Sequence, residues 1–290
     1  MKALNYPKIS IVTPSFNQGQ YLEETILSVL GQEYPNLEYI IIDGGSTDNS
    51  VEIIKKYEKQ LAFWCSEKDN GMYDAIQKGF AKSTGEIMGW INSDDRYHAK
   101  SFFVLAQVFN SFPEVEWLQG NPTSIDEQGR IVSAFSSRKW SKYNFLRRDY
   151  KYIQQESTFW KRSLWEKAGS RLNTALKYAG DFELWLRFFD HARLYALNTA
   201  LGAFRLRSEN QLSLDRIEDY HKEAEAEITK KLNSLSADEK EKLSIISAPP
   251  KFSDKLKYFR VRREMKIREI LNYPPLIVFD RITQSFVIKK

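Results

Sequence analysis

The feature that most constrains the fold is a regular alternation of short apolar runs and helical segments over the first hundred residues. Residues 9–12 form a β-branched run, and residues 21–30 carry apolar side chains at helical spacing. The pattern repeats, with further strands expected at 37–42, 63–66 and 87–91 and helices at about 50–59 and 72–82. Strand–helix–strand units of this kind predict an α/β protein with a mostly parallel central sheet flanked by helices.

Polar and acidic side chains follow several of the expected strands. Thr13 and Pro14 come after the first run, Asp43 after the second, and Asp94 and Asp95 after the run that ends at residue 91. Ligands of open parallel sheets bind beyond the carboxyl ends of the strands. Two adjacent carboxylates repel each other, and a divalent cation between them usually bridges the protein to substrate phosphates. The pattern therefore predicts a substrate that is a nucleotide diphosphate.

Composition excludes several classes of protein. Of the 290 residues, 42% are hydrophobic and 28% charged, as is ordinary for a soluble globular protein. Cys65 is the only cysteine, which excludes a disulfide framework and a cysteine zinc site. No secretory signal is visible at the N-terminus, and no run reaches the ~18 apolar residues of a membrane span. We expect a cytoplasmic protein.

Positive charge is concentrated near the C-terminus. The formal net charge is only +5, but from residue 251 onward basic residues far outnumber acidic ones and alternate with aromatic and aliphatic side chains. Such a segment is typical of a surface that lies on an anionic membrane or binds nucleic acid, and equally of a solvated helical tail packed on its own domain. The sequence leaves these alternatives open, although nucleic acid is not the expected partner.

Seven short motifs, in order and with consistent spacing, resemble glycosyltransferase family 2. The chain is most similar to the small bacterial enzymes that build O-antigen and other surface polysaccharides. The motifs cover roughly residues 9–210 and are Ile11-Val-Thr-Pro-Ser-Phe-Asn17, Ile42-Asp-Gly-Gly-Ser-Thr-Asp48, Ser66-Glu-Lys-Asp-Asn-Gly-Met-Tyr-Asp-Ala75, Gly85-Glu-Ile, Asn92-Ser-Asp-Asp95, Gln155-Glu-Ser-Thr-Phe-Trp-Lys-Arg-Ser163 and Ala179-Gly-Asp-Phe-Glu-Leu-Trp-Leu-Arg187.

The resemblance implies a GT-A, Rossmann-like fold. Residues 1–210 would form the glycosyltransferase domain, with a nucleotide-sugar half at 1–100 and an acceptor half at 101–210. Residues 211–290 would form a basic, helical C-terminal extension. A helix is expected over about 215–245, and the Ala248-Pro-Pro250 segment predicts a break before the basic tail.

The resemblance also assigns the donor site. Thr13 and Pro14 would lie beside the nucleotide base, Asp43 would hold the base or ribose, and Asp69 would extend the pocket. Gly44 stands where many members of the family have a second acid, so another group must make that contact.

In the family's metal-binding motif, Asn92 replaces the first acid and brings no charge. Asp94 would also contact the donor, and the metal ligands, for Mn²⁺ or Mg²⁺, would be Asp94 and Asp95. The alternative is that these acids cap and precede a helix at 97–109.

Asp181 is the candidate for the catalytic base. An acceptor hydroxyl is a poor nucleophile near neutral pH, and a carboxylate within hydrogen-bond reach can take its proton. Asp181 begins a helical segment at 182–189, and the family places its base here; the alternative is an ordinary helix N-cap. One cation on the leaving group and one base opposite predict a single displacement that inverts the anomeric centre.

Gln155, Glu156 and Trp160 resemble the family's acceptor or donor-sugar segment, since polar groups followed by aromatics suit carbohydrate. The alternative is a strand with one polar and one core face. Arg205, Arg207 and Ser208 are expected either in a loop over the diphosphate or in a solvated turn.

The predicted activity is non-processive, because the Gln-x-x-Arg-Trp element and membrane spans of processive members are missing from the sequence. The donor would be a nucleotide sugar, most commonly a UDP-sugar. The acceptor would be a saccharide or a polyprenyl-linked saccharide, which places the protein peripherally at the inner face of the cell membrane. Two rivals are a non-catalytic scaffold or membrane-associated binding protein, and a sugar-nucleotide pyrophosphorylase; against the latter, residues 13–20 contain no lysine or arginine.

Overall fold

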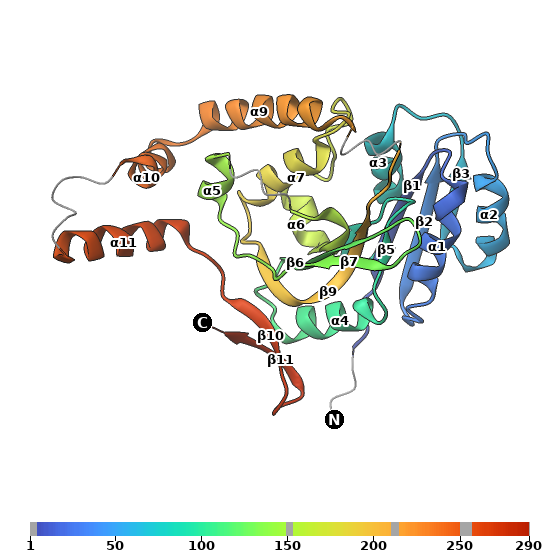
Figure 1. Cartoon of the computed structure of the whole chain (residues 1–290), viewed down its shortest axis with the longest axis horizontal. Helices are drawn as coiled ribbons and strands as arrows, with labels where there is room; N and C mark the ends of the chain where they lie inside the picture. The colour runs from blue at the N-terminus through green and yellow to red at the C-terminus, as the bar shows by residue number, and fades with distance from the viewer. Residues whose placement is uncertain (1–4, 149–152, 210–214, 250–256, 290) are drawn as a thin grey trace.

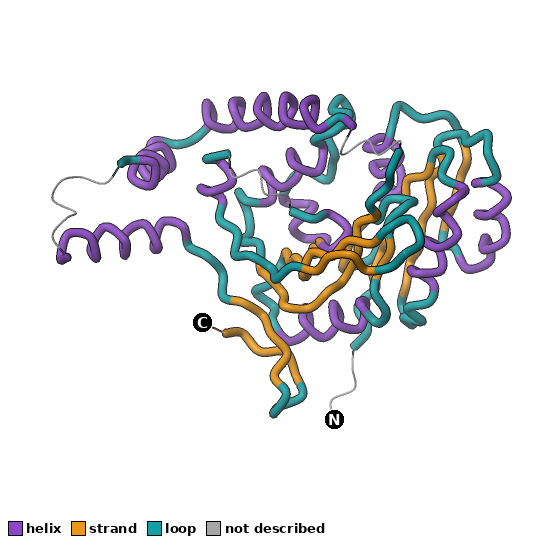
Figure 2. Tube along the Cα trace, in the orientation of Figure 1, coloured by secondary structure: helices purple, strands orange, loops and turns teal. Residues whose placement is uncertain are grey.

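The computed structural model describes residues 5–148, 153–209, 215–249 and 257–289. Its centre is a mixed sheet in which neighbouring strands follow the order β11-β10-β9-β6-β8-β4-β1-β2-β3. Figure 1 shows this sheet running through the molecule, and Figure 2 shows helices on both sides of the strands. A sheet covered on both faces must be apolar on both faces, which explains the unbroken apolar runs of the sequence.

The first hundred residues form the predicted strand–helix units. The strands β1, β2, β3 and β4 are parallel, and Ser15 at the end of β1 lies opposite Asp43 at the end of β2. The helices and strands of this half are β1 (Ile9–Ser15), α1 (Gly19–Leu30), β2 (Leu37–Asp43), α2 (Ser50–Tyr57), the 3-10 turn η1 (Glu58–Gln60), β3 (Phe63–Ser66), α3 (Met72–Lys82) and β4 (Ile87–Trp90).

Alternate residues of each strand enter different cores. Val12, Ile40 and Ile42 pack on the face covered by α3, whereas Ile11 and Ile41 pack on the face covered by α1 and α2. This follows from the two-residue period of a strand, which sends successive side chains to opposite faces.

The second half continues the same sheet with mixed strand directions. The strand β8 is antiparallel to both β4 and β6, and β9 runs parallel to β6. The elements are β5 (Arg96–Tyr97), α4 (Ser101–Ser111), β6 (Trp117–Ile125), β7 (Ile131–Ala134), α5 (Lys142–Leu146), η2 (Gln155–Ser157), β8 (Thr158–Lys161), α6 (Arg162–Lys167), α7 (Gly180–Phe188) and β9 (Tyr195–Arg205).

The helix expected at 97–109 begins later than predicted. Tyr97 belongs to β5, where it pairs with Gly202 of β9, and α4 starts at Ser101 after Lys100 adopts a left-handed conformation with φ 63°. Four residues therefore separate Asp95 from Lys100, the N-cap of α4, and the alternative that the acidic pair caps this helix is wrong.

The C-terminal segment contains α9 (Ile217–Ser234), α10 (Ala237–Ser247), α11 (Lys257–Leu271), β10 (Leu276–Asp280) and β11 (Ser285–Lys289). The helices agree with the predicted extension, and part of the predicted break at 248–250 lies outside the described residues. The closing hairpin was not predicted: Ile277 of β10 pairs with Leu197 of β9, so the segment returns to the central sheet. No helix in the described ranges is long and apolar enough to cross a membrane.

The packing of α3 on β1 depends on a glycine. A Cβ at Gly79 would lie 2.4 Å from Cγ1 of Val12, so the helix approaches the strand more closely than any larger residue permits. We expect Gly79→Ala to lower the free energy of unfolding by about 1–3 kcal/mol through overpacking, although alanine is the better helix former. Denaturant unfolding measures this.

The control is Lys78→Ala on the same helix, whose half-buried side chain forms long ion pairs with Asp74 and Glu67 and should contribute less than about 1 kcal/mol to stability. A Gly79→Ala protein as stable as the control would show that the close approach is not required.

Candidate active site

The expected donor end of the site lies where β1 and β2 finish. Thr13 and Pro14 are buried at the end of β1, and the hydroxyl groups of Thr13 and Tyr39 lie 3.0 Å apart. The Asp43 carboxylate is fully buried and accepts hydrogen bonds from the Ser46 backbone N–H at 2.9 Å and the Ser66 hydroxyl at 2.7 Å. Asp43 therefore shapes the turn that follows β2 and joins it to β3.

Asp69 occupies the space that a side chain at position 44 would fill. A Cβ added to Gly44 would lie 2.7 Å from Oδ2 of Asp69. The other oxygen, Oδ1, accepts a hydrogen bond from the Gly71 backbone N–H at 2.8 Å. A carboxylate from a neighbouring loop thus lies beside position 44, where the expected second acid is missing, and a larger residue at position 44 would displace the Asp69 carboxylate.

The two adjacent acids after β4 have different environments. Asp94 is partly exposed, and its Oδ2 lies 3.1 Å from Nη2 of Arg207. Asp95 is 1% exposed; its Oδ1 accepts from the Arg205 backbone N–H at 2.8 Å and its Oδ2 from the Asn92 amide at 3.2 Å. Burial raises the pKa of both carboxyls, for Asp95 well above its usual range with help from the Asp94 charge, whereas Arg207 lowers that of Asp94.

Arg205 and Arg207 belong to this site and not to a solvated turn. The fully buried Arg205 guanidinium donates to the backbone oxygen of Asp94 at 2.6 Å and pairs with Glu24 at 2.5 Å. Ser208 donates to Glu127 through both its backbone N–H and its hydroxyl, each at 2.7 Å. The end of β9 is therefore held over the acidic pair.

The segment 154–161 contributes polar groups at its start and core packing at its end. Gln155 donates to the backbone oxygen of Trp90 at 2.6 Å. Glu156 is 3% exposed, and its Oε1 has no hydrogen-bond partner among the described groups. Trp160 is fully buried against Trp90 and Trp185, so its ring packs in the core and is not placed to stack on a sugar.

Asp181 lies in the first turn of α7, two residues after its N-cap residue Ala179. Burial raises the pKa of its carboxyl to about 6, and hydrogen bonds from the Phe182 backbone and the Tyr73 hydroxyl oppose that rise. The Tyr73 hydroxyl lies 3.3 Å from Oδ1 of Asp181 and 2.9 Å from the Tyr178 backbone oxygen. Asp181 is therefore not the N-cap, and it has the pKa of a base active near neutral pH.

Tyr73 is a site residue that sequence reasoning missed, although it lies within one of the motifs. A Cβ on Gly180 would lie 2.8 Å from the Tyr73 ring, so the glycine before Asp181 allows the ring to reach the carboxylate. The conjunction of a tyrosine at the start of α3 with Ala-Gly-Asp at the start of α7 is the signal that could have revealed it.

Electrostatics show that these acids gather in one region. Burial, together with the charges of Asp94 and Asp181, raises the pKa of Glu156 to about 8. The charge of Glu156 in turn raises the pKa of Asp95. Since Coulomb interactions of this kind act over short distances, Glu156 connects the acidic pair with Asp181.

The carboxylate oxygens of Asp94 are suitable ligands for a hard divalent cation. Within the described ranges no group of three or more His, Cys, Asp or Glu side chains is arranged to hold a metal. A cation bound jointly with substrate phosphates needs only one or two protein carboxylates, and Asp94 offers a partly exposed one that already faces a positive group. Both oxygens of Asp95 accept N–H groups, so Asp94 is the better ligand of the two.

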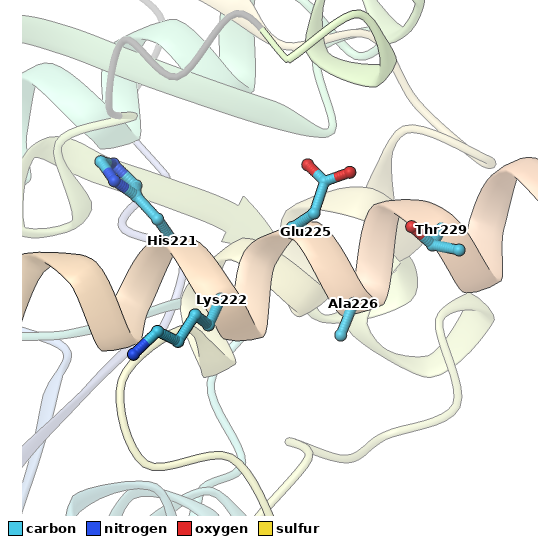
Figure 3. A pocket seen from close by; sticks show the side chains of 5 residues that line it. All are labelled: His221, Lys222, Glu225, Ala226 and Thr229. Atoms are coloured by element: carbon cyan, nitrogen blue, oxygen red, sulfur yellow. The ribbon is translucent and has the colours of Figure 1, made fainter.

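A separate hollow lies on the surface of α9. It is lined by His221, Lys222, Glu225, Ala226 and Thr229, which Figure 3 shows along one stretch of the helix. Glu225 forms an ion pair with Arg148 at 2.5 Å. None of the predicted site residues lines this hollow.

Comparison with known proteins shows the family that this chain resembles. Residues 10–161 match the family model described as "Glycosyl transferase family 2". A putative teichuronic acid biosynthesis glycosyltransferase of Bacillus subtilis, TuaG, is 35% identical over 94 residues, which are 31% of this chain and 37% of that protein. An uncharacterized glycosyltransferase of Rickettsia typhi is 24% identical over 242 residues, 76% of this chain and 71% of that one. The first relatives, from Mycobacterium tuberculosis, are matched over 35% of their length.

Solved structures share the GT-A fold. S. aureus TarS in complex with UDP-GlcNAc aligns over 91% of this chain and 72% of its own, with a TM-score of 0.61 and 18% identity. The mannosyltransferase PcManGT of Pyrobaculum calidifontis, in complex with GDP-Man and Mn²⁺, aligns over 92% and 86%, with a TM-score of 0.53 and 17% identity. At these identities the likeness shows the fold.

The contact between Tyr73 and Asp181 makes a prediction about acidity. Tyr73→Phe removes a hydrogen bond that favours the charged carboxylate, so the pKa of Asp181 should rise above its value of about 6. Carbon-13 NMR titration of the carboxyl groups measures this, with Asp181→Asn identifying the signal.

Tyr178→Phe is the control, because it removes a neighbouring hydroxyl and leaves the Tyr73 hydroxyl in place. An unchanged Asp181 titration in the Tyr73→Phe protein would show that the hydroxyl does not tune this acid.

Proposed function

Because the chain belongs to glycosyl transferase family 2, we propose that it is an inverting, non-processive, metal-dependent transferase that moves a sugar from a nucleotide diphosphate to an acceptor hydroxyl. The observation that carries the proposal is that Trp90, which ends the strand before Asp94, stacks on Trp185 of α7, the helix whose first turn holds Asp181, at 5.9 Å between ring centres. An acid for the leaving group and a base for the acceptor thus meet in one region.

The donor would bind along the ends of β1, β2 and β4. Thr13, Pro14, Asp43 and Asp69 would surround the nucleoside, in a pocket whose turn is already held by hydrogen bonds to Asp43. Asn92 and Asp94 follow β4 and would lie toward ribose and diphosphate. A uridine nucleotide is our first choice, since TarS was solved with UDP-GlcNAc.

Asp94, assisted by Asp95, would hold the divalent cation. When bound, Mn²⁺ or Mg²⁺ supplies positive charge to the diphosphate as the glycosidic bond breaks. The role of Asp95 would be mainly to fix the turn, because its oxygens accept the Arg205 and Asn92 N–H groups. Arg205 in turn holds the Asp94 backbone.

Asp181 would act on the acceptor. The acceptor oxygen forms a bond to the anomeric carbon while the bond from that carbon to the diphosphate oxygen breaks, and the hydroxyl proton moves to Asp181. One displacement inverts the anomeric centre. Gln155 and Glu156 would bind sugar hydroxyls, and the Glu156 Oε1, which is without a partner in the described structure, is the group we assign to the donor or acceptor sugar.

The acceptor would be a saccharide or a polyprenyl-linked saccharide of a surface polysaccharide such as an O-antigen. The likeness to TuaG, a putative teichuronic acid biosynthesis enzyme, supports this class of pathway. The protein would act in the cytoplasm, at the inner face of the membrane where such acceptors are carried.

Two substitutions test the roles of the acids separately. Asp181→Asn should lower kcat by about 100-fold or more while the Kd for the nucleotide-sugar donor stays within about twofold. Asp94→Asn should instead weaken donor binding in the presence of Mn²⁺. Calorimetry with a panel of sugar nucleotides, followed by product analysis, makes both measurements.

Glu166→Gln, which removes an exposed carboxylate from α6, is the control and should behave as wild type. Normal turnover by the Asp181→Asn protein would show that Asp181 is not the catalytic base. Donor binding without turnover in the wild-type protein, over the full acceptor panel, would favour the non-catalytic scaffold.

The outer side of α11 supports contact with an anionic membrane. Tyr258, Val261 and Met265 are 69%, 42% and 66% exposed, and their spacing places them along one stripe of the helix. Arg262 and Arg268 are also exposed and flank this stripe, as does the acidic Glu269, while Ile267 on the inner side is half-buried. An apolar stripe between arginines suits a bilayer surface with anionic lipids, into which apolar groups insert while the cations pair with phosphates.

The change Tyr258→Ser/Val261→Ser/Met265→Ser should reduce binding of the full chain to vesicles of phosphatidylglycerol and phosphatidylcholine by about tenfold, as measured by co-sedimentation. The control, Ile131→Ser/Val132→Ser/Phe135→Ser, removes similarly exposed apolar groups from β7 and its end. Deleting residues 251–290 is a poorer test, because it would also remove β10 and β11 from the sheet.

Equal vesicle binding by the two triple variants would show that the exposed apolar stripe of α11 is not the membrane-binding surface. Binding of DNA without binding of vesicles would replace the membrane by a nucleic acid as the partner of this surface.

A further inference from the structure

We propose that Arg207 occupies the place of the cation beside Asp94 in the ligand-free protein, and that Asp94 accepts a divalent metal only when a diphosphate gives the guanidinium another partner. The inference rests on the proposed function, because it assumes that the donor carries a diphosphate. It also predicts how the ligands bind: the metal binds together with the nucleotide-sugar donor, and Arg207 prevents the metal from binding alone.

The first observation is the ion pair itself. Nη2 of Arg207 lies 3.1 Å from Oδ2 of Asp94, and the two side chains are only 10% and 16% exposed. A guanidinium and a divalent cation repel each other, and the low exposure leaves little water to screen that repulsion. The carboxylate therefore cannot take a metal on this oxygen until Arg207 moves.

The second observation is where Arg207 lies. Its Nη1 donates to Oε1 of Gln18 at 3.2 Å, and its guanidinium lies 5.7 Å from the centre of the Tyr21 ring. Gln18 directly precedes α1, and the adjacent Asn17 N–H donates to Ser46 in the turn after β2. Arg207 thus lies between the proposed metal ligand and the loops of the proposed nucleoside pocket, on the path that a diphosphate takes between them.

The third observation distinguishes the two arginines of this segment. Arg205 is fully buried and donates to three backbone oxygens, those of Asp94, Asp126 and Glu127, in addition to its ion pair with Glu24. Backbone partners of this kind stay in place when a ligand binds. The partners of Arg207 include the Gln18 amide and the Asp94 carboxylate that would ligate a metal, and its planar guanidinium is suited to a phosphate. Arg205 is accordingly the structural residue and Arg207 the one that exchanges partners.

The test measures Mn²⁺ binding by electron paramagnetic resonance, without turnover. Wild-type protein should bind Mn²⁺ weakly in the absence of nucleotide and at least about tenfold more tightly with UDP. Arg207→Gln frees Asp94, so this variant should bind Mn²⁺ without nucleotide about tenfold more tightly than wild type, while its affinity for UDP falls. Arg207→Met repeats the measurement with an apolar side chain of similar length if the Gln variant does not fold.

The control is Arg96→Gln, which removes a guanidinium that pairs with Glu24. Equal gains in Mn²⁺ affinity for the Arg96 and Arg207 variants would reveal a general charge effect and overturn the proposal, as would no gain for Arg207→Gln. Wild-type protein that binds UDP but no Mn²⁺, even together, would overturn the metal dependence in the proposed function, and this inference with it. Wild-type protein that binds no nucleotide diphosphate at all would overturn the donor class.

Discussion

The interaction on which the rest of the site depends is the buried guanidinium of Arg205. It joins the end of β9 to the turn after β4 through the Asp94 backbone, to α1 through Glu24, and to the β6–β7 turn through Asp126 and Glu127. A buried charge is tolerated only when it is paired and its hydrogen-bond donors are satisfied, so each of these partners is required by the others. The shape of the acidic site therefore follows from one cation that never reaches solvent.

Around the Arg205 guanidinium the site holds four carboxyl groups, and the positive charges of Arg205 and Arg207 are too few to balance them. Burial raises the pKa of Asp94, Asp95, Glu156 and Asp181, for Glu156 to about 8 and for Asp181 to about 6. Acids in this state resist ionisation until positive or hydrogen-bonding groups arrive. Burying these acids lowers the folding stability, but it leaves groups that can bind a cation and hydroxyl groups. Acids with shifted pKa values are common in catalytic sites.

The periodicity of the sequence predicted the first half of the fold because each strand there is covered on both faces and each helix has one apolar side. It placed the start of α4 too early, since the apolar pattern at 97–109 cannot reveal that Tyr97 pairs with Gly202 across the sheet. The hairpin β10–β11 was not predicted, for a similar reason. The sequence assigns residues 276–279 to a basic tail, and only the pairing with β9 and β11 shows that these residues form a strand.

The residues of the site were predictable as members of motifs, but their partners were not. Trp160 illustrates the limit, because an aromatic residue beside polar ones fits a sugar platform as well as a core, and its burial decides for the core. The meaning of Gly44 became visible only with Asp69 beside it, and that of Tyr73 only with Gly180. In each case the decisive contact joins segments that are distant in sequence.

The pairing of β10 with β9 has a consequence for biosynthesis. One strand carries Arg205 at its carboxyl end and, at Leu197, the docking position for a segment that the ribosome delivers some eighty residues later. Until that segment emerges, the part of the β9 edge near Leu197 is open to other chains, which is the usual hazard of an unpaired strand, whereas Gly202 and Ala203 already pair with β5. Burial of this part of the sheet is thereby linked to synthesis of residues 276–289, and a chain without them would leave an unpaired strand edge beside the element that carries Arg205.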